Sequence, residues 1–273
     1  MTVRIADEQA VVERERLVRG SASKAPACPD GGFAFQGRPA GLAVAPDGTV
    51  LVSDATSRSI LRISAGGAPA VVAGPASVIP GAAGRRVLNP AGLAVAADGS
   101  VFVADTTGHR IWAASPAGSL RLVAGSIYGY RDGPGAEAQF RFPSGVAIGQ
   151  DGTCDVADTG SDRIRTITPD GLVATLAGSI YDYGDGRGSP AGFRRPEAVA
   201  VDVDGTCYVA DTGNGALRRI DRSGASTTPL RLYGPHWPVA VARAPDKAVI
   251  VAVAELDDLR RPQACLISVG AVG

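Results

Sequence analysis

Two side chains in the last third of the chain could carry acid–base chemistry. Glu197 and His236 each lie within two residues of a proline that recurs along the chain. Arg195 lies two residues before Glu197. A carboxyl group and an imidazole can exchange protons with a substrate near neutral pH. The three side chains predict a small-molecule site if the fold gathers them around one opening. The alternative is a surface salt bridge between Glu197 and an arginine, with His236 solvated in a loop.

Aromatic and arginine side chains recur in the segments around these prolines. The paired phrases GSIYGYRDG (125–133) and GSIYDYGDG (178–186) show this best. Such side chains could hold an organic anion or a peptide; alternatively, the rings anchor long loops and the charges keep those loops solvated. The predicted ligand-binding residues are Arg38, Asn89, Tyr128, Tyr130, Phe142, Tyr181, Tyr183, Arg195 and Trp237.

One carboxylate interrupts a close internal repetition. Residues 152–160 read GTCDVADTG and residues 205–213 read GTCYVADTG, so Asp155 corresponds to Tyr208. The equivalent residues of the other copies are also bulky: Leu51, Phe102 and Ile250. We therefore expect Asp155 to face a neighbouring repeat, where a buried carboxylate needs a partner such as an arginine or titrates unusually. An ion pair or a partly open slot is a simpler interpretation than catalysis.

All of these residues belong to or flank a segment that recurs five times. The repeat cores span 38–63, 89–114, 142–167, 195–220 and 237–268. Within each copy, apolar residues alternate with a period of two and β-branched residues are frequent, which predicts strands. Asp-Gly pairs at 47–48, 98–99, 151–152 and 204–205 predict hairpin turns.

An aspartate follows the second expected strand in four copies: Asp54, Asp105, Asp158 and Asp211. We expect these carboxylates to cap the following bend by accepting backbone N–H groups. Arg110 and Arg163, five residues after an aspartate, could pair with it. Because the aspartate recurs, its role is predicted to be structural.

Four antiparallel strands in each copy predict blades of an all-β propeller. Five copies predict a five-bladed β-propeller, formed as a single domain over residues 1–273. The fifth copy lacks a fourth strand, and RLVRGSA (16–22) resembles RLVAGSI (121–127), so we expect the N-terminal strand to close the last blade. Closure removes exposed strand edges and predicts a monomer. Small, uncharged first strands would line a central tunnel, with polar chemistry at its mouths.

The unit, exemplified by NPAGLAVAADGSVFVADTTGHRI (89–111), resembles the NHL-repeat family of β-propellers. This resemblance covers residues 16–268 and implies the propeller fold. NHL propellers include protein- and RNA-binding scaffolds, and similar rings include lyases, so the resemblance implies neither a binder nor an enzyme alone. It places His109, in the GHRI stretch, at a structural position.

Composition argues against several classes of function. The chain has 27 Lys and Arg residues against 27 Asp and Glu residues, which disfavours nucleic acid or an anionic membrane as a partner. The four cysteines have no CxxC spacing and there are only two histidines, so we expect no metal site and no cofactor. The N-terminal residues lack the apolar core of a signal peptide, which predicts a cytoplasmic protein.

Three functions remain open at this point. The first is a cytoplasmic propeller that binds a small organic ligand or a peptide at the loop-rich mouth of its tunnel. The second is a metal-independent lyase, cyclase or isomerase that uses Glu197 and His236 as acid–base groups. The third is a scaffold for protein–protein interaction.

Overall fold

The computed structural model describes residues 2–6, 9–13, 39–45, 47–63, 70–74, 87, 89–178, 184–187, 191–243, 248–256 and 262–269. The described residues are almost entirely strands and turns, so the fold is all-β, with five small sheets that form the blades of a β-propeller. The chain divides into two compact units, Val18–Val146 and Met1–Leu17 with Ala147–Gly273, which are described separately. No helix in the described ranges is long and apolar enough to cross a membrane.

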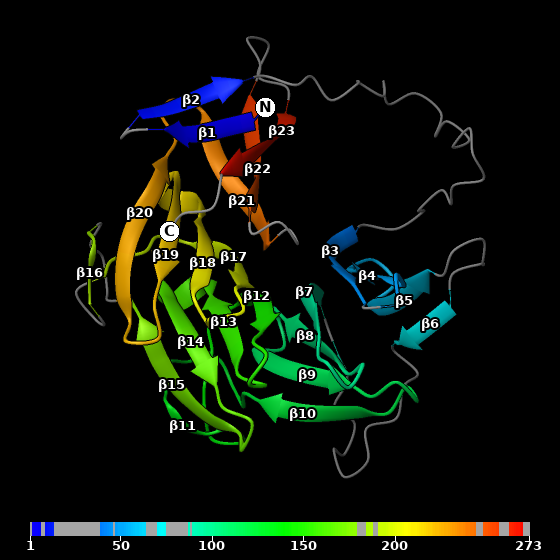
Figure 1. Ribbon diagram of the computed structural model, residues 1–273. Helices are drawn as coiled ribbons and strands as arrows, with labels where there is room; N and C mark the ends of the chain where they lie inside the picture. Colours follow the sequence, from blue (N-terminus) through cyan, green and yellow to red (C-terminus); the bar gives the residue numbers. More distant parts are fainter. Residues whose placement is uncertain are drawn as a thin grey trace, which may run out of the picture. The chain divides into compact units, whose positions relative to one another are not determined.

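The first two sheets have four antiparallel strands each and belong to the unit Val18–Val146 (Figure 1). The first has the order β3 (Pro39–Val44), β4 (Val50–Asp54), β5 (Ser59–Ile63) and β6 (Ala70–Ala73). The second has the order β7 (Pro90–Val95), β8 (Val101–Asp105), β9 (Arg110–Ala114) and β10 (Leu120–Ala124). Both confirm the four-stranded unit that alternation predicts.

The third and fourth sheets repeat this order and gain a short fifth strand. The third has the order β12 (Pro143–Ile148), β13 (Cys154–Asp158), β14 (Arg163–Ile167), β15 (Leu172–Ala177) and β11 (Gly133–Pro134). The fourth has the order β17 (Pro196–Val201), β18 (Cys207–Asp211), β19 (Ala216–Ile220), β20 (Ala225–Arg231) and β16 (Gly186–Arg187). The prediction of four strands is therefore corrected for these two sheets, because a piece of the preceding connection pairs with the outer strand.

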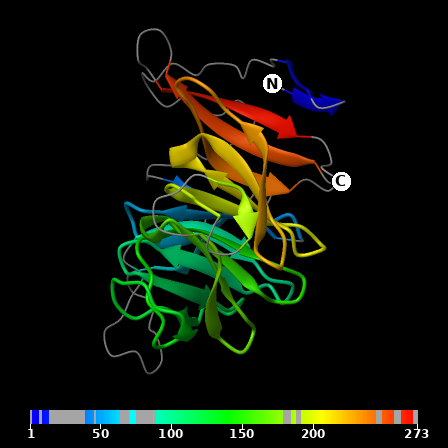
Figure 2. The ribbon, with the colours of Figure 1, turned by 90° about the vertical axis from the view of Figure 1, so that its left-hand side faces the viewer.

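The fifth sheet combines both ends of the chain. It has the order β21 (His236–Arg243), β22 (Val249–Leu256), β23 (Pro262–Val269), β1 (Thr2–Ala6) and β2 (Gln9–Glu13). The orange and red strands β21–β23 lie side by side in both ribbon views (Figure 2). β1 pairs with β23 in parallel. The segment 16–22, which the sequence predicts as the closing strand, lies outside the described residues, so closure by that segment stays a prediction.

The Asp-Gly pairs form the predicted hairpin turns between the first and second strands. Gly48 has φ +80° and donates its N–H to Ala45 O, while Asp47 Oδ1 accepts the Thr49 N–H. The same left-handed glycine recurs at Gly99, Gly152 and Gly205. Only glycine adopts this backbone region without a steric penalty, which explains why the dipeptide recurs.

Two of the four aspartates after the second strands cap the following bend as predicted, whereas Asp158 and Asp211 make no side-chain cap hydrogen bond to the turn that follows them. Asp54 Oδ1 accepts the Thr56 N–H at 2.8 Å. Asp105 Oδ1 accepts N–H groups of Asn89 and Gly108 at 2.8 and 3.2 Å. In three repeats, a side chain seven residues after the aspartate donates to its carboxylate. The sequence had instead predicted a partner five residues after the aspartate. Trp112 Nε1 donates to Asp105, Arg165 pairs with Asp158 and Arg218 pairs with Asp211, at 3.1–3.2 Å. The expected partners Arg110 and Arg163 donate to the backbone carbonyls of Gly108 and Ser161.

The core lies between neighbouring sheets. In the unit Val18–Val146, Leu51 of β4 packs with Leu93, Val101 and Trp112 of the next sheet. In the other unit, Tyr208 of β18 packs with Val241 and Val249 of the fifth sheet. The bulky position that Leu51 and Tyr208 share therefore faces the neighbouring repeat, as predicted.

Asp155 occupies the same position on β13 and is fully buried. Its carboxylate accepts hydrogen bonds from Arg222, which follows β19 in the next repeat. The prediction of an arginine partner is thus confirmed. Burial raises the pKa of Asp155, and the nearby Arg222 acts in the opposite direction.

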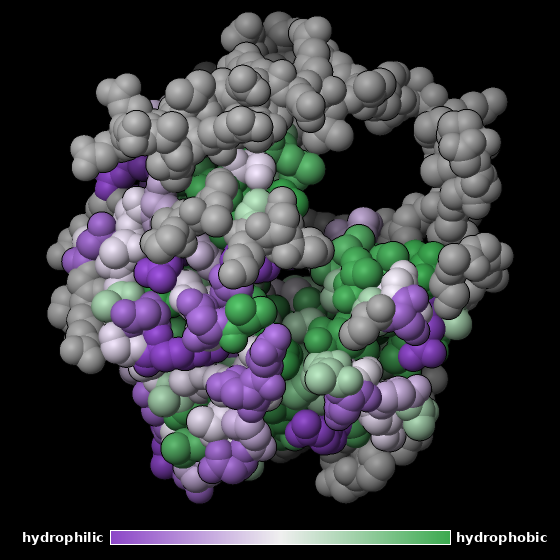
Figure 3. All heavy atoms as spheres, viewed as in Figure 1, coloured by the Kyte–Doolittle hydropathy of each residue, from purple (hydrophilic) through white to green (hydrophobic). Residues whose placement is uncertain are grey.

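Some apolar side chains of the unit Val18–Val146 reach the surface. Leu42 and Val44 of β3 are more than half exposed, and hydrophobic atoms gather over this part of the molecule (Figure 3). The strand therefore presents an apolar edge beside the polar Asp-Gly turn that follows it.

Candidate functional site

A pocket of about 480 Å³ lies in the unit that contains residues 147–273. Glu197 and His236, the two predicted acid–base residues, both line this pocket. Arg195 and Trp237, two predicted ligand-binding residues, line it as well. The complete lining is Arg195, Glu197, Thr212, Gly213, Asn214, Gly215, Leu232, Gly234, His236 and Trp237.

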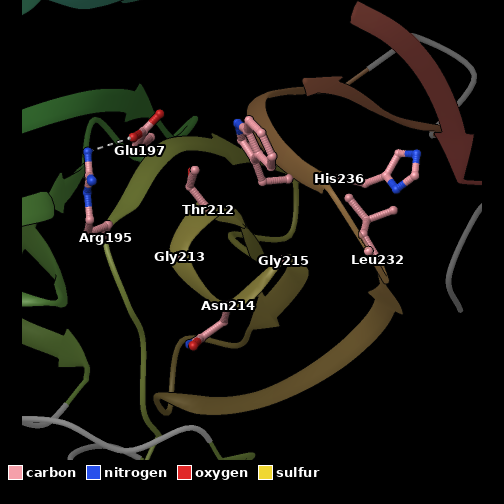
Figure 4. A pocket seen from close by; sticks show the side chains of 10 residues that line it. Arg195, Glu197, Thr212, Gly213, Asn214, Gly215, Leu232 and His236 are labelled. Atoms are coloured by element: carbon pink, nitrogen blue, oxygen red, sulfur yellow. Dashed lines mark ion pairs between the residues drawn. The ribbon is translucent and has the colours of Figure 1, made fainter. Parts of the chain in front are cut away.

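The two predicted acid–base residues stand on opposite sides of the pocket. Arg195 and Glu197, from the start of β17, lie on one side, and Leu232 and His236 lie on the other (Figure 4). The turn Thr212–Gly215 lies between them. A ligand in the pocket could therefore contact a carboxyl group at one end and an imidazole at the other.

Glu197 forms an ion pair with Arg195, at 3.6 Å between Oε1 and Nη2. The Arg195 side chain is 72% exposed, whereas that of Glu197 is 31% exposed. Burial raises the pKa of Glu197, and the Arg195 charge opposes this effect only in part. The Glu197 carboxyl group therefore keeps its proton to a higher pH than an ordinary glutamate.

His236 is oriented by the backbone of the preceding segment. Its Nδ1 lies 2.7 Å from Tyr233 O. Because a carbonyl oxygen only accepts hydrogen bonds, Nδ1 carries a proton in this contact, and neutral His236 then bears its lone pair on Nε2. This arrangement suits a base or a hydrogen-bond acceptor at Nε2.

The floor of the pocket is a short 3-10 turn, η2 (Thr212–Asn214), that ends at Gly215. Thr212 Oγ1 donates to Pro238 O at 2.7 Å, which joins this turn to the first strand of the next repeat. Asn214 Nδ2 donates to Asp211 Oδ2 at 2.9 Å. The turn is therefore held by Asp211, the aspartate that follows the second strand of this repeat. Trp237 and Leu232 supply the apolar wall of the pocket.

The remaining predicted residues do not belong to this pocket. In the unit Val18–Val146, Tyr128 and Phe142 pack edge-to-face on His109, with ring centroids 5.2 and 4.9 Å from the imidazole. The Arg141 guanidinium lies 5.5 Å from the Tyr128 ring centroid. This His109 cluster supports the interpretation that aromatic rings anchor loops, although Tyr128 and Phe142 remain about half exposed.

The five other predicted ligand-binding residues have different outcomes. Tyr130 is 39% exposed in the same unit as the His109 cluster, and Asn89 donates its backbone N–H to Asp105. Arg38, Tyr181 and Tyr183 lie outside the described residues. Their role in binding stays a prediction.

Sequence reasoning missed the backbone-lined half of the pocket. Gly213, Gly215 and Gly234 have no side chains to suggest chemistry, and Leu232 reads as a core residue. One signal was present: Gly215 stands where the equivalent repeats have Arg58, His109 and Asp162. Among the described residues, no group of three or more His, Cys, Asp or Glu side chains could hold a metal ion.

Comparison with known proteins identifies the repeat. The family model of the NHL repeat matches residues 88–113, which coincide with the second repeat core. The chain therefore contains an NHL repeat. It is 38% identical over 82 residues to NHL repeat-containing protein 2 of Gallus gallus, a match that covers 29% of this chain and 11% of the relative.

Other curated relatives of this NHL-repeat protein are much longer. The match to Protein SUPPRESSOR OF QUENCHING 1, chloroplastic, of Arabidopsis thaliana is 31% identical over 145 residues. It covers 48% of this chain and 14% of that protein. The chain therefore corresponds to a small part of these relatives.

Solved structures share the fold at low sequence identity. Virginiamycin B lyase from Staphylococcus aureus superposes with a TM-score of 0.57 at 18% identity, over 84% of this chain and 69% of the lyase. A gluconolactonase from Xanthomonas campestris superposes with a TM-score of 0.58 at 17% identity, over 84% and 72%. These similarities concern the fold, whose neighbours include a lyase and a lactonase.

Proposed function

We propose that this NHL-repeat protein binds a small organic ligand or a peptide in the pocket between Glu197 and His236. The observation that carries the proposal is the convergence of Glu197, His236, Arg195 and Trp237 on one pocket of about 480 Å³. Pockets of this size that combine an aromatic wall with a few polar groups are typical of ligand sites.

The lining favours a ligand with a flat or cyclic apolar part and a polar group. The half-buried Trp237 offers an indole ring for stacking, and Arg195 offers an exposed guanidinium. The Glu197 carboxyl group, whose pKa is raised by burial, can donate a hydrogen bond when it holds its proton. A ligand of this kind does not require the lysine-rich surface that typically binds nucleic acid.

Acid–base catalysis at the same pocket is the second candidate function. It is favoured by two observations: the raised pKa of Glu197, and the Nδ1 contact that leaves the lone pair of neutral His236 on Nε2. A carboxyl group with a raised pKa on one side of the pocket and an imidazole on the other could donate and remove protons at two points of one substrate, as a lyase, cyclase or isomerase requires. The structural neighbours include a lyase and a lactonase. They support acid–base catalysis in this protein only through the shared fold.

Binding can be tested with compounds related to these neighbours. The protein has two tryptophans, Trp112 and Trp237, so its indole N–H resonances report on one core site and one pocket site. We expect gluconolactone, virginiamycin B or a member of a fragment library to shift the Trp237 resonance and leave Trp112 unchanged. Because Trp237→Leu removes this reporter, binding to the variants is measured by isothermal titration calorimetry. Trp237→Leu should abolish binding, whereas Phe142→Leu, which changes an exposed ring elsewhere, should not.

Two results would contradict the proposal. The first is binding that persists unchanged in Trp237→Leu. The second is a screen in which no compound perturbs Trp237 although the protein is folded. A cytoplasmic location, a monomeric state and a role as a protein-interaction scaffold remain predictions from the sequence.

A further inference from the structure

Two side chains of the repeat are replaced beside the pocket. After the second strand, the second and third repeats have His-Arg (109–110) and Asp-Arg (162–163), whereas the fourth has Gly-Ala (215–216). The backbone is nearly the same in the third and fourth repeats, because Asp162 has φ +53° and ψ +44° and Gly215 has φ +61° and ψ +36°. The fourth repeat therefore keeps the turn but has no arginine after it.

In the second repeat, this arginine binds two backbone carbonyl groups. Arg110 Nη1 donates to Gly108 O at 2.9 Å, and Arg110 Nη2 donates to Ser126 O at 2.6 Å. One guanidinium therefore connects the turn with the segment that follows the outer strand. In the third repeat, Arg163 Nη1 donates to Ser161 O at 2.7 Å, which is the equivalent of the first of these bonds. The alanine of the fourth repeat cannot donate such a bond.

The carbonyl group of Leu232 is the one that loses this donor in the fourth repeat. Leu232 stands 16 positions after the alanine, as Ser126 stands 16 positions after the arginine. The Leu232 N–H donates to Gly215 O at 2.7 Å. The Gly215 N–H, which would complete this antiparallel pair, instead donates to Thr212 O at 3.2 Å. Leu232 O therefore receives neither the arginine of the other repeat nor the reciprocal N–H.

A second carbonyl oxygen flanks the same space. A Cβ atom added to Gly215 would lie 3.3 Å from Leu232 O and 3.5 Å from His236 O. Carbonyl groups two residues apart on a strand point to the same side, and Pro238 O accepts the Thr212 Oγ1 hydrogen from the preceding repeat. Gly215, Leu232 and His236 all line the pocket. This part of the pocket is therefore bordered by hydrogen-bond acceptors.

The other lining side chains suit a flat organic cation. Neutral His236 carries its lone pair on Nε2, because Nδ1 contacts Tyr233 O. Trp237 supplies an indole ring, whose face attracts cations. The charged side chains Arg195 and Glu197 pair with each other on the opposite side of the pocket (Figure 4). The lining therefore has no excess positive charge that would repel a cation.

We propose that the pocket binds a guanidinium or amidinium group, whose N–H groups donate to Leu232 O and His236 O in place of the arginine that the fourth repeat lacks. A planar cation of this kind presents several N–H donors at once, as Arg110 does to two carbonyl groups in its own repeat. This inference rests on the proposed ligand-binding function and adds the chemical class of the ligand. Small guanidines and arginine residues of peptides both carry the group.

The first test uses the wild-type chain and three probes that share one aromatic ring. Benzamidinium carries planar N–H donors, benzoate has a similar shape but only acceptors, and N,N,N-trimethylanilinium is a cation without N–H groups. We expect benzamidinium to shift the Trp237 indole resonance in a two-dimensional ¹H–¹⁵N spectrum. Benzoate and trimethylanilinium should bind at least about tenfold more weakly, because neither can donate to the carbonyl oxygens.

A calorimetric titration distinguishes the two sources of the group. Methylguanidinium represents a small guanidine, and the peptide acetyl-Ala-Arg-Ala-amide represents an arginine residue. The same peptide with norleucine in place of arginine is the control. At least about tenfold tighter binding of the arginine peptide than of methylguanidinium identifies a peptide ligand, and similar binding of the two identifies a small guanidine. An arginine peptide that binds no better than the norleucine peptide, together with no binding of methylguanidinium, contradicts the inference.

The second test returns the arginine to the repeat. Ala216→Arg should place a guanidinium against the turn and Leu232 O, and should weaken benzamidinium binding by at least about tenfold. Ala216→Met is the matched control, because it adds a long side chain without a donor at a position outside the pocket lining. It should bind benzamidinium within about threefold of the wild type. Ala216 is buried, so thermal unfolding must show that both variants are folded.

The outcomes separate this inference from the binding function. If benzoate or trimethylanilinium binds as tightly as benzamidinium, the pocket binds ligands but the inference is wrong. The same conclusion follows if folded Ala216→Arg binds benzamidinium as the wild type does. If no probe or library compound perturbs Trp237 in the wild type, the proposed function fails as well. The three-probe comparison needs no variant, so it decides the matter even if Ala216→Arg does not fold.

Discussion

The Arg222 guanidinium donates to both carboxylate oxygens of Asp155, with Nη1 2.8 Å from each oxygen. The same position in the next repeat holds Tyr208, and the guanidinium of Arg243 lies 5.7 Å from its ring centroid. At both positions the side chain contacts an arginine of the following repeat. Asp155 does so through an ion pair, and Tyr208 does so through a cation–π contact. The mismatch between the two nearly identical repeats is structural.

The ion pair predicts an asymmetric effect of its two partners on stability. Asp155 is fully buried, whereas the Arg222 side chain is 31% exposed. Arg222→Met should lower the free energy of unfolding by about 3 kcal/mol, because it leaves a buried carboxylate without its charge partner. Asp155→Leu should change it by less than about 1 kcal/mol, since Arg222 reaches solvent and Leu51 fills the equivalent slot.

Urea unfolding of the two single variants and of Asp155→Leu/Arg222→Met would measure these effects. The double variant should be more stable than Arg222→Met, because the buried charge is gone. If Asp155→Leu lowers the free energy of unfolding as much as Arg222→Met does, the predicted asymmetry between the two partners is wrong.

Trp112 takes the place of an arginine in the second repeat. Its Nε1 donates to Asp105 Oδ2 at 3.2 Å, where Arg165 and Arg218 pair with the aspartates of the next repeats. Trp112→Phe keeps most of the ring but removes this donor from a fully buried carboxylate. We expect a loss of about 1–3 kcal/mol in the free energy of unfolding.

Trp237→Phe is the control for that measurement, because Trp237 lines a solvent-accessible pocket. It should change the free energy of unfolding by less than about 0.5 kcal/mol. Equal effects of the two substitutions in urea unfolding would show that the Trp112–Asp105 hydrogen bond has no special role.

The buried Asp211 predicts a pH dependence of stability. Burial raises the pKa of Asp211 to about 6, although Arg194 N–H, Asn214 and Arg218 donate to its carboxylate. The folded protein therefore holds this proton more tightly than the unfolded chain, whose aspartate pKa is near 3.8. The resulting stabilisation is fully present below about pH 3.8 and is lost as the pH rises through about 6.

Asp211→Asn removes this titration. Its stability relative to the wild type should rise by up to about 3 kcal/mol between pH 4 and pH 7. Asp47→Asn should give a slope of the opposite sign, and only below about pH 3.8, because the Thr49 N–H hydrogen bond lowers the pKa of Asp47. Unfolding curves for Asp211→Asn and the wild type that stay parallel over this range would rule out the raised pKa.

Glu197→Gln tests the catalytic alternative at the pocket. If the protein is an enzyme that uses this carboxyl group, turnover should fall by at least about 100-fold. The thermal midpoint should change little, because Glu197 is partly exposed and its pair with Arg195 is 3.6 Å long. A substrate found in the binding screen supplies the assay, and normal turnover in this variant would exclude the role of Glu197.

The sequence alone determined the strands, the hairpin turns and the five repeats. These features depend on local alternation and on Asp-Gly pairs, whose glycine adopts the left-handed conformation wherever the dipeptide occurs. It also predicted that Asp155 needs a partner such as an arginine or titrates unusually, because burial of a lone carboxylate is unfavourable in any fold.

Only the tertiary structure decided which residues meet. The partner of Asp155 is 67 positions away, in the next repeat. Residues five and seven positions after Asp158 lie on the same face of β14, so alternation alone could not distinguish Arg163 from Arg165 as its partner. Gly215 has no side chain to suggest a site, and its place in the pocket lining became visible only in the folded chain, because a pocket is formed by residues from several segments.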